Sequence, residues 1–106
     1  MLSGQTLRFD YPNGLSYRLH IQNETQLDWE CLSGDEKGNT GFETYQMSRV
    51  GEQQYFITWL EKDDTAVAEL IDLSTKKVHA QILVPTTLTG LTRALQLHLV
   101  GEITVL

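Results

Sequence analysis

Two glutamates stand where a carboxylate could do chemistry, because each shares a strand face with aromatic side chains. Glu61 lies two residues after Trp59, and Glu43 lies two residues before Tyr45. A carboxylate that points inward destabilises the fold by several kcal/mol unless it is paired or protonated. Its pKa would then rise, and it could bind a ligand or exchange a proton. The alternative is that both glutamates sit at strand ends, at the rim of the fold, in water.

Aromatic residues recur on the same strand faces as these glutamates. A buried tyrosine or tryptophan needs a hydrogen-bond partner, and several that converge in a small barrel often line a pocket. The alternative is a purely structural role, in which the rings fill the core. If the apolar faces turn inward, the interior collects most of the aromatic residues of the chain: Phe9, Tyr11, Tyr17, Trp29, Tyr45, Tyr55 and Trp59.

Other kinds of site have little support in the sequence. His20 and His79 fall on polar strand faces, His98 stands alone, and one cysteine, Cys31, can form neither a disulfide nor a thiolate metal site. Ser33 has no histidine placed to activate it, and the glycines lack the strand and helix that a phosphate loop requires. We therefore predict no metal and no cofactor.

Length and charge restrict the remaining classes. The 106 residues are enough for one domain, which we expect to span 1–106. A net charge of −6 with only eight scattered basic residues argues against nucleic acid as a partner. No apolar run is long enough for a membrane helix and no secretion signal is visible, so we expect a cytoplasmic protein. Assembly into a homo-oligomer stays open.

The elements that must position these residues are strands. Apolar and polar residues alternate with a period of two, and turn residues such as Pro12-Asn13-Gly14 interrupt the pattern every eight to twelve positions. Residues 65–72 are apolar on both faces apart from Glu69 and Asp72, and 86–91 favours a loop or a short helical turn before a last strand. Seven to nine short strands with hairpin turns predict an all-β antiparallel meander that closes into a small barrel, with a sandwich as the fallback.

Several segments resemble the MoaF-like family, which is named after a molybdenum-cofactor-biosynthesis protein. The resemblance covers roughly residues 4 to 85 and is clearest in the turn Tyr11-Pro12-Asn13-Gly14 and in the loop Gly34-Asp35-Glu36-Lys37-Gly38. Trp29-Glu30-Cys31 and the segment from Tyr55 to Glu61 extend it. Membership implies a calycin fold, the lipocalin-like barrel, in agreement with the strand pattern.

The same landmarks are more distantly similar to phenolic acid decarboxylases, which hold a hydroxycinnamic acid with two tyrosines and an arginine and move a proton with a glutamate. In this resemblance Tyr11 matches the second tyrosine and Glu61 matches the glutamate. Phe9 replaces the first tyrosine, and Asn39 stands where the arginine would be. These two departures remove a hydroxyl and the cation that would meet a carboxylate.

We interpret the chain as a binding protein for a small apolar or aromatic molecule. An alternative is a lyase or isomerase in which Glu61 is the general acid/base and Tyr11 orients the substrate; a second alternative is a structural or assembly module with a filled core. A filled core predicts no cavity, and the enzyme predicts a hydrogen bond between Glu61 and a tyrosine. The predicted ligand-binding residues are Tyr11, Tyr17, Trp29, Tyr45, Trp59 and Glu61.

Overall fold

The protein is built almost entirely from antiparallel strands. A computed structural model describes residues 2–106, in which the only helix is the four-residue α1, Thr86–Thr89. The all-β meander predicted from the sequence is confirmed. No helical segment of residues 2–106 has the length and apolar character needed to cross a bilayer. The strands are β1 Thr6–Asp10, β2 Ser16–Ile21, β3 Gln26–Cys31, β4 Thr40–Thr44, β5 Gln46–Gly51, β6 Gln54–Leu60, β7 Ala66–Asp72, β8 Lys77–Val84 and β9 Leu95–Val105.

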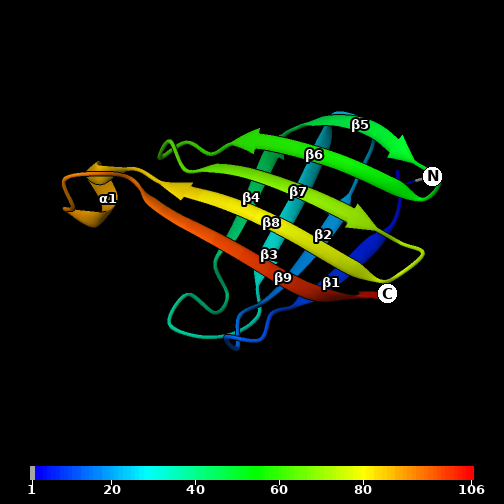
Figure 1. Ribbon diagram of the computed structural model, residues 1–106, viewed down its shortest axis with the longest axis horizontal. Helices are drawn as coiled ribbons and strands as arrows, with labels where there is room; N and C mark the ends of the chain where they lie inside the picture. The colour runs from blue at the N-terminus through cyan, green and yellow to red at the C-terminus, as the bar shows by residue number, and fades with distance from the viewer. Residues whose placement is uncertain (1) are drawn as a thin grey trace.

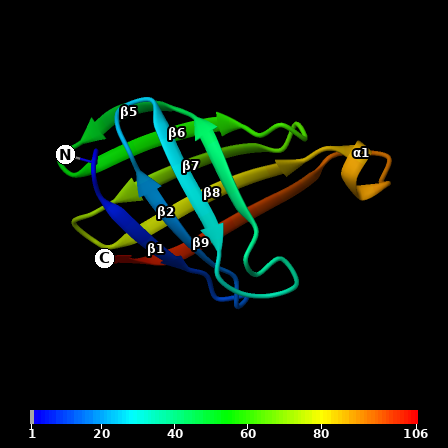
Figure 2. The same ribbon diagram turned by 180° about the vertical axis from the view of Figure 1, so that it is seen from behind.

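The strands form one sheet that curls into a nearly closed barrel. Their order is β4-β3-β2-β1-β9-β8-β7-β6-β5, and all neighbours are antiparallel. Pairing of β1 with β9 joins the two ends of the chain, whereas β4 and β5 are linked only through Tyr45 between them. Figure 1 shows β5–β9 crossing in front of β1–β4, and Figure 2 shows the same two layers from behind. The layers enclose one interior with two ends.

Turn chemistry explains where the strands reverse. In the β1–β2 turn, the Asn13 side chain accepts a hydrogen bond from the Leu15 amide (3.1 Å), and Gly14 takes a φ of 90° that favours glycine. Pro85 ends β8, and Gly90, with a φ of 72°, ends α1. The tip formed by β8, α1 and β9 extends beyond the rest of the barrel (Figure 1).

One end of the interior is solid. The segment before β1 bends back on the barrel, where the Gly4 amide donates to the Ile21 carbonyl (2.7 Å) and the Leu2 side chain is buried. Inward-facing aliphatic side chains of β1, β2, β3, β7 and β8 come together at this end. The residues that fill it are almost wholly buried: Leu2, Leu7, Ile21, Leu27, Ile71, Leu73 and Val78.

Candidate functional site

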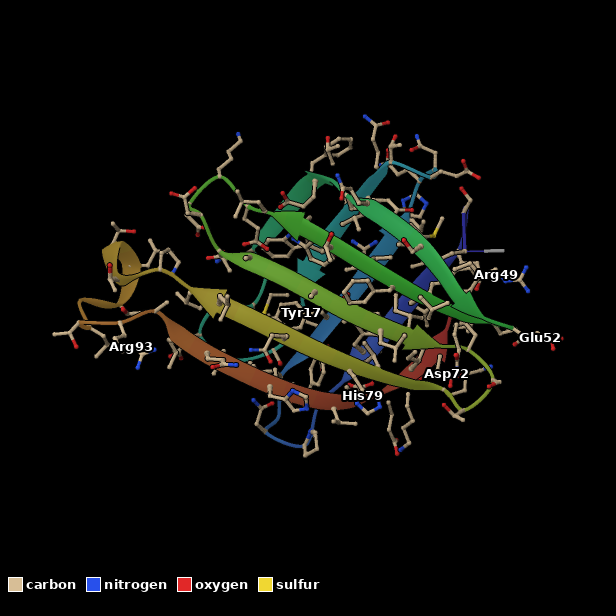
Figure 3. The ribbon with its side chains drawn as sticks, turned by 45° about the horizontal axis from the view of Figure 1, so that its top comes forward. Tyr17, Arg49, Glu52, Asp72, His79 and Arg93 are labelled. Atoms are coloured by element: carbon tan, nitrogen blue, oxygen red, sulfur yellow. The ribbon has the colours of Figure 1, made fainter. Side chains whose placement is uncertain are left out.

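The other end of the interior contains a cavity of about 550 Å³. Its mouth lies among the β3–β4 loop, the β6–β7 turn and the tip that carries α1, which contribute Glu36, Asp63 and Leu88. A filled barrel, one of the alternatives left by the sequence, would have no such space. The aromatic residues that line it are Phe9, Tyr11, Tyr17, Trp29 and Trp59. Figure 3 shows Tyr17 between the two layers of strands.

Three of these rings form a continuous edge-to-face series across neighbouring strands. Tyr11 and Tyr17 have ring centroids 6.5 Å apart, and Tyr17 and Trp29 have centroids 6.4 Å apart, with interplanar angles near 70°. This geometry is the one that the ring quadrupole favours. The series forms one wall of the cavity, opposite the strands β6 and β7.

Two glycines make room for this wall. Gly41 pairs with Trp29 across β3 and β4, and a methyl group on Gly41 would lie 2.3 Å from the indole. A methyl group on Gly101 of β9 would lie 2.7 Å from the Tyr11 ring. Both rings therefore rest directly on backbone, and any larger residue at either glycine must displace its ring.

Each tryptophan of the cavity donates its indole N–H to a glutamate. Trp29 donates to Glu43 (Nε1 to Oε2, 3.0 Å), and Trp59 donates to Glu61 (Nε1 to Oε2, 3.1 Å). Glu43 is buried and Glu61 is half-buried. Both glutamates therefore lie on the aromatic side of their strands, as the alternation predicted for an inward orientation. The enzyme alternative predicted a tyrosine partner for Glu61, but the hydrogen bond to this carboxyl comes from Trp59 instead.

Glu61 lines the cavity at the end of β6, where the tight β6–β7 turn begins. Burial raises the pKa of its carboxyl above the usual range, and the Trp59 hydrogen bond acts in the opposite direction. The negative charges of Glu43, Asp63 and Glu36 raise this pKa further. A carboxyl in such surroundings holds its proton more tightly than one in water.

Glu69 is a second cavity carboxyl, and the pattern of its strand in the sequence does not reveal it. It lies on β7 with 5% of its surface exposed, and its Oε1 is buried without a hydrogen-bond partner. Burial and the charge of Glu61 raise the pKa of this carboxyl to about 8. The charge of Glu69 in turn adds to burial in raising the pKa of the Tyr11 hydroxyl. At neutral pH, Glu69 is therefore mostly the neutral acid.

The register of the β6–β7 hairpin could have revealed Glu69. In its turn, the Glu61 amide donates a hydrogen bond to the Thr65 carbonyl. The pairing of β6 with β7 then sets Trp59 opposite Val67 and Ile57 opposite Glu69. Paired residues point to the same face of a sheet, so Glu69 must share the inner face with Trp59. The apolar character of both faces of residues 65–72 concealed this orientation when the strand was considered alone.

Five of the six predicted site residues line the cavity, and Tyr45 does not. Tyr45 lies in the corner between β4 and β5, is 2% exposed, and donates its hydroxyl to the Asn23 carbonyl (2.7 Å). It is therefore part of the solid core, because the corner turns it toward the closed end. Tyr17 lines the cavity, where burial is the main cause that raises its pKa to about 12.

The two positions that depart from the decarboxylase pattern differ in their placement. Phe9 lines the cavity, whereas Asn39 is exposed in the β3–β4 loop, where its carbonyl accepts a hydrogen bond from the Cys31 amide (2.8 Å). Asn39 is not among the cavity-lining residues of the described chain. An acid bound in the cavity would therefore meet no cation at that position.

A family model for MoaF-like proteins matches residues 3–94. The chain belongs to the MoaF-like family. This match contains every residue that lines the cavity except those of the last strand, so the site described above belongs mainly to the part shared with the MoaF-like family. The resemblance noted in the turn and loop motifs is thereby confirmed.

Individual proteins are also similar to this MoaF-like chain. A probable phenolic acid decarboxylase of Vibrio cholerae is 32% identical over 83 residues, which are 77% of this chain and 48% of the relative. The chain thus spans about half the length of that curated relative. A crystal structure from Burkholderia vietnamiensis, described as a candidate β-lactamase, superposes with a TM-score of 0.85 over 99% of this chain and 95% of that one. Its 20% identity supports a shared fold and nothing about activity.

Proposed function

We propose that this protein binds a small, largely aromatic or apolar molecule inside the open end of its barrel. The observation that carries this proposal is the aromatic-lined cavity of about 550 Å³, which lies at the end of the barrel opposite the buried aliphatic residues. Binding sites for small molecules are typically concave, mostly apolar and of this size, with a few polar groups that fix orientation. Here Tyr11, Tyr17, Glu61 and Glu69 are those polar groups.

Both tryptophans of the chain line this cavity, so their fluorescence reports on its contents. Titration with 2-phenylethanol, within a wider panel of neutral aromatic and aliphatic compounds, should give a saturable change in emission and a rise in melting temperature. Ile82→Phe should weaken binding at least tenfold, because Ile82 faces the cavity and a larger ring would occupy it. Its neighbour Leu83 is exposed on the other face of β8, so Leu83→Phe is the matched control and should leave binding unchanged.

No saturable response to any member of the panel would contradict the binding proposal. Equal loss of affinity in the two variants would contradict the assignment of the site to the cavity, because only one of the two residues faces it.

A second candidate function is a lyase or isomerase that uses Glu61 as general acid/base and Tyr11 to orient the substrate. Two observations favour it: Glu61 and Tyr11 line one cavity, and the chain is 32% identical to a probable phenolic acid decarboxylase. Against it stand Phe9, which has no hydroxyl, and Asn39, which lies outside the cavity. A hydroxycinnamate anion would also enter a cavity already lined by carboxyl groups.

We therefore expect no detectable decarboxylation of p-hydroxycinnamic acid, measured as release of the vinylphenol. Turnover that disappears in Glu61→Gln and persists in the exposed control Glu102→Gln would instead establish the enzyme and refute our preference for a binding protein. The glutamine variant keeps the shape of the side chain and the acceptor for Trp59 while it removes the exchangeable proton.

A further inference from the structure

The cavity is acidic as well as aromatic. Four carboxyl side chains line it, from the β3–β4 loop, the β6–β7 turn and β7: Glu36, Glu61, Asp63 and Glu69. Among residues 2–106, no lysine, arginine or histidine is a lining residue. Figure 3 shows Arg93 at the projecting tip and Arg49 at the opposite end of the barrel. Other basic side chains form ion pairs on the outer surface, as Arg18 does with Glu30 and Lys77 with Glu102.

Glu69 is buried inside the cavity, whereas Glu36 and Asp63 at the mouth are exposed. It is 5% exposed, it lines the cavity, and its Oε1 has no partner within the protein. A buried polar atom without a partner costs about 1–3 kcal/mol, and more when the group is charged. A ligand that supplies a donor, and especially a positive charge, would remove this cost. The unsatisfied oxygen therefore favours a ligand that carries a hydrogen-bond donor and a positive charge.

The aromatic walls suit the same kind of ligand. The faces of tryptophan and tyrosine rings attract organic cations, by about 0.5–2 kcal/mol per contact, with the larger values in desolvated sites. Two tyrosines and two tryptophans line the cavity together with the four carboxyl groups. No group of three or more histidine, cysteine, aspartate or glutamate residues within 2–106 could hold a metal ion. An organic cation fits this lining better than a metal ion does.

We propose that the ligand of this cavity is a small organic amine, whose ammonium group pairs with Glu69 while its apolar body contacts the aromatic walls. This inference rests on the proposed binding function and narrows the ligand to a cation. Glu61 supplies a second negative charge, and the mouth residues Glu36 and Asp63 attract a cation from solvent. Carboxylate ligands, including hydroxycinnamates, are repelled by the same groups.

Binding should release a proton. Glu61 from the end of β6 and Tyr11 from the end of β1 interact electrostatically with Glu69, while β8 presents apolar Ala80 at the paired position. With a pKa of about 8, Glu69 holds its proton at pH 7 in the free protein. When the ammonium arrives, the O–H bond of this carboxyl breaks, the proton goes to the buffer, and the amine keeps its own charge. We expect release of close to one proton per ligand at pH 7.

Three probes of nearly equal size test the charge: phenethylamine, 2-phenylethanol and 3-phenylpropionate. By calorimetry at pH 7, we expect phenethylamine to bind at least tenfold more tightly than 2-phenylethanol, and 3-phenylpropionate to bind most weakly. Glu69→Gln should lose the tenfold preference for the amine over the alcohol, because it removes the negative charge that the ammonium meets. Glu102→Gln, an exposed glutamate on β9, is the control and should behave as the wild type.

Repetition of the amine titration in phosphate and in Tris, whose ionisation enthalpies differ, measures the proton released by the unaltered protein. This measurement does not depend on the folding of any variant. Binding of the alcohol at equal or greater strength than the amine would overturn the cationic ligand and leave the binding function intact, as would amine binding without proton release. Binding of none of the three probes, nor of any neutral compound in the panel, would overturn both proposals.

Discussion

The two ends of the barrel interior are formed by the same strands but contain different side chains: aliphatic residues fill one end, and aromatic and carboxyl side chains line a cavity at the other. At the closed end, aliphatic residues such as Leu27 and Ile71 are fully buried in one cluster, and Leu2, which precedes the first strand, is buried with them. At the open end, rings and carboxyl groups surround a cavity of about 550 Å³. Close packing at one end stabilises the barrel, and this stability allows the other end to hold a buried carboxyl that opposes folding when it ionises. In this barrel, the residues that contribute most to stability and the residues that line the cavity therefore lie at opposite ends of one interior.

The largest effect should come from the closed end. Leu27 is fully buried there, so Leu27→Ala should lower the free energy of unfolding by about 2–5 kcal/mol through lost burial and an unfilled cavity. Leu99 is the counterpart at the open end, where one side of it already faces empty space. Leu99→Ala should cost about 1 kcal/mol or less, because fewer contacts are lost. Urea denaturation of both variants measures the difference, and equal losses would remove the distinction between the two ends.

The next largest effect is a dependence of the free energy of unfolding on pH, which arises from Glu69 at the open end. Glu69 has a pKa of about 8 in the folded protein and a lower, ordinary pKa when unfolded, so the folded state binds more protons between these values. Stability should therefore be highest below pH 4.5 with respect to this group, and it should fall by a few kcal/mol, to order of magnitude, as the pH rises through about 8. The half-buried Glu61, whose pKa is also raised, acts in the same direction.

Glu69→Gln should flatten this decline and make the protein more stable than the wild type at pH 8, while the two remain similar at pH 4.5. Urea midpoints at a series of pH values provide the measurement. Glu102→Gln, whose glutamate forms an exposed pair with Lys77, is the control. A variant with the same slope as the wild type would mean that Glu69 is not the group that titrates.

The smallest expected effect comes from substitution of two glycines, one beside the cavity and one away from it. Gly41→Ala at the open end should displace the Trp29 ring and break its bond to Glu43, at a cost of about 1–3 kcal/mol, with altered tryptophan emission and weaker binding of 2-phenylethanol. Gly51 lies in β5, away from the cavity, and a methyl group there meets the side chain of Gln54. Because that side chain is flexible, Gly51→Ala should leave emission and binding unchanged. Similar emission spectra for the two variants would contradict the seating of Trp29 on Gly41.

Much of the site was accessible from the sequence because alternation records which face of a strand a residue occupies. Tyr11, Tyr17, Trp29, Trp59 and Glu61 were all predicted to line the site, and all of them line the cavity. Glu69 was missed because residues 65–72 carry apolar groups on both faces, so the pattern of that strand alone does not say which face is inside. The pairing of Ile57 with Glu69 across the hairpin supplies the missing information.

The sequence by itself determined the strands, their turns and the inner face of most of them, because hydrophobic periodicity and turn residues act over a few positions. It did not determine how far along the barrel each inward residue lies. That depth depends on closure of β1 against β9, on the corner at Tyr45 and on the return of Leu2 over one end. These are long-range arrangements, and only the tertiary structure decides that Tyr45 lies in the buried core while Glu69 lines the cavity.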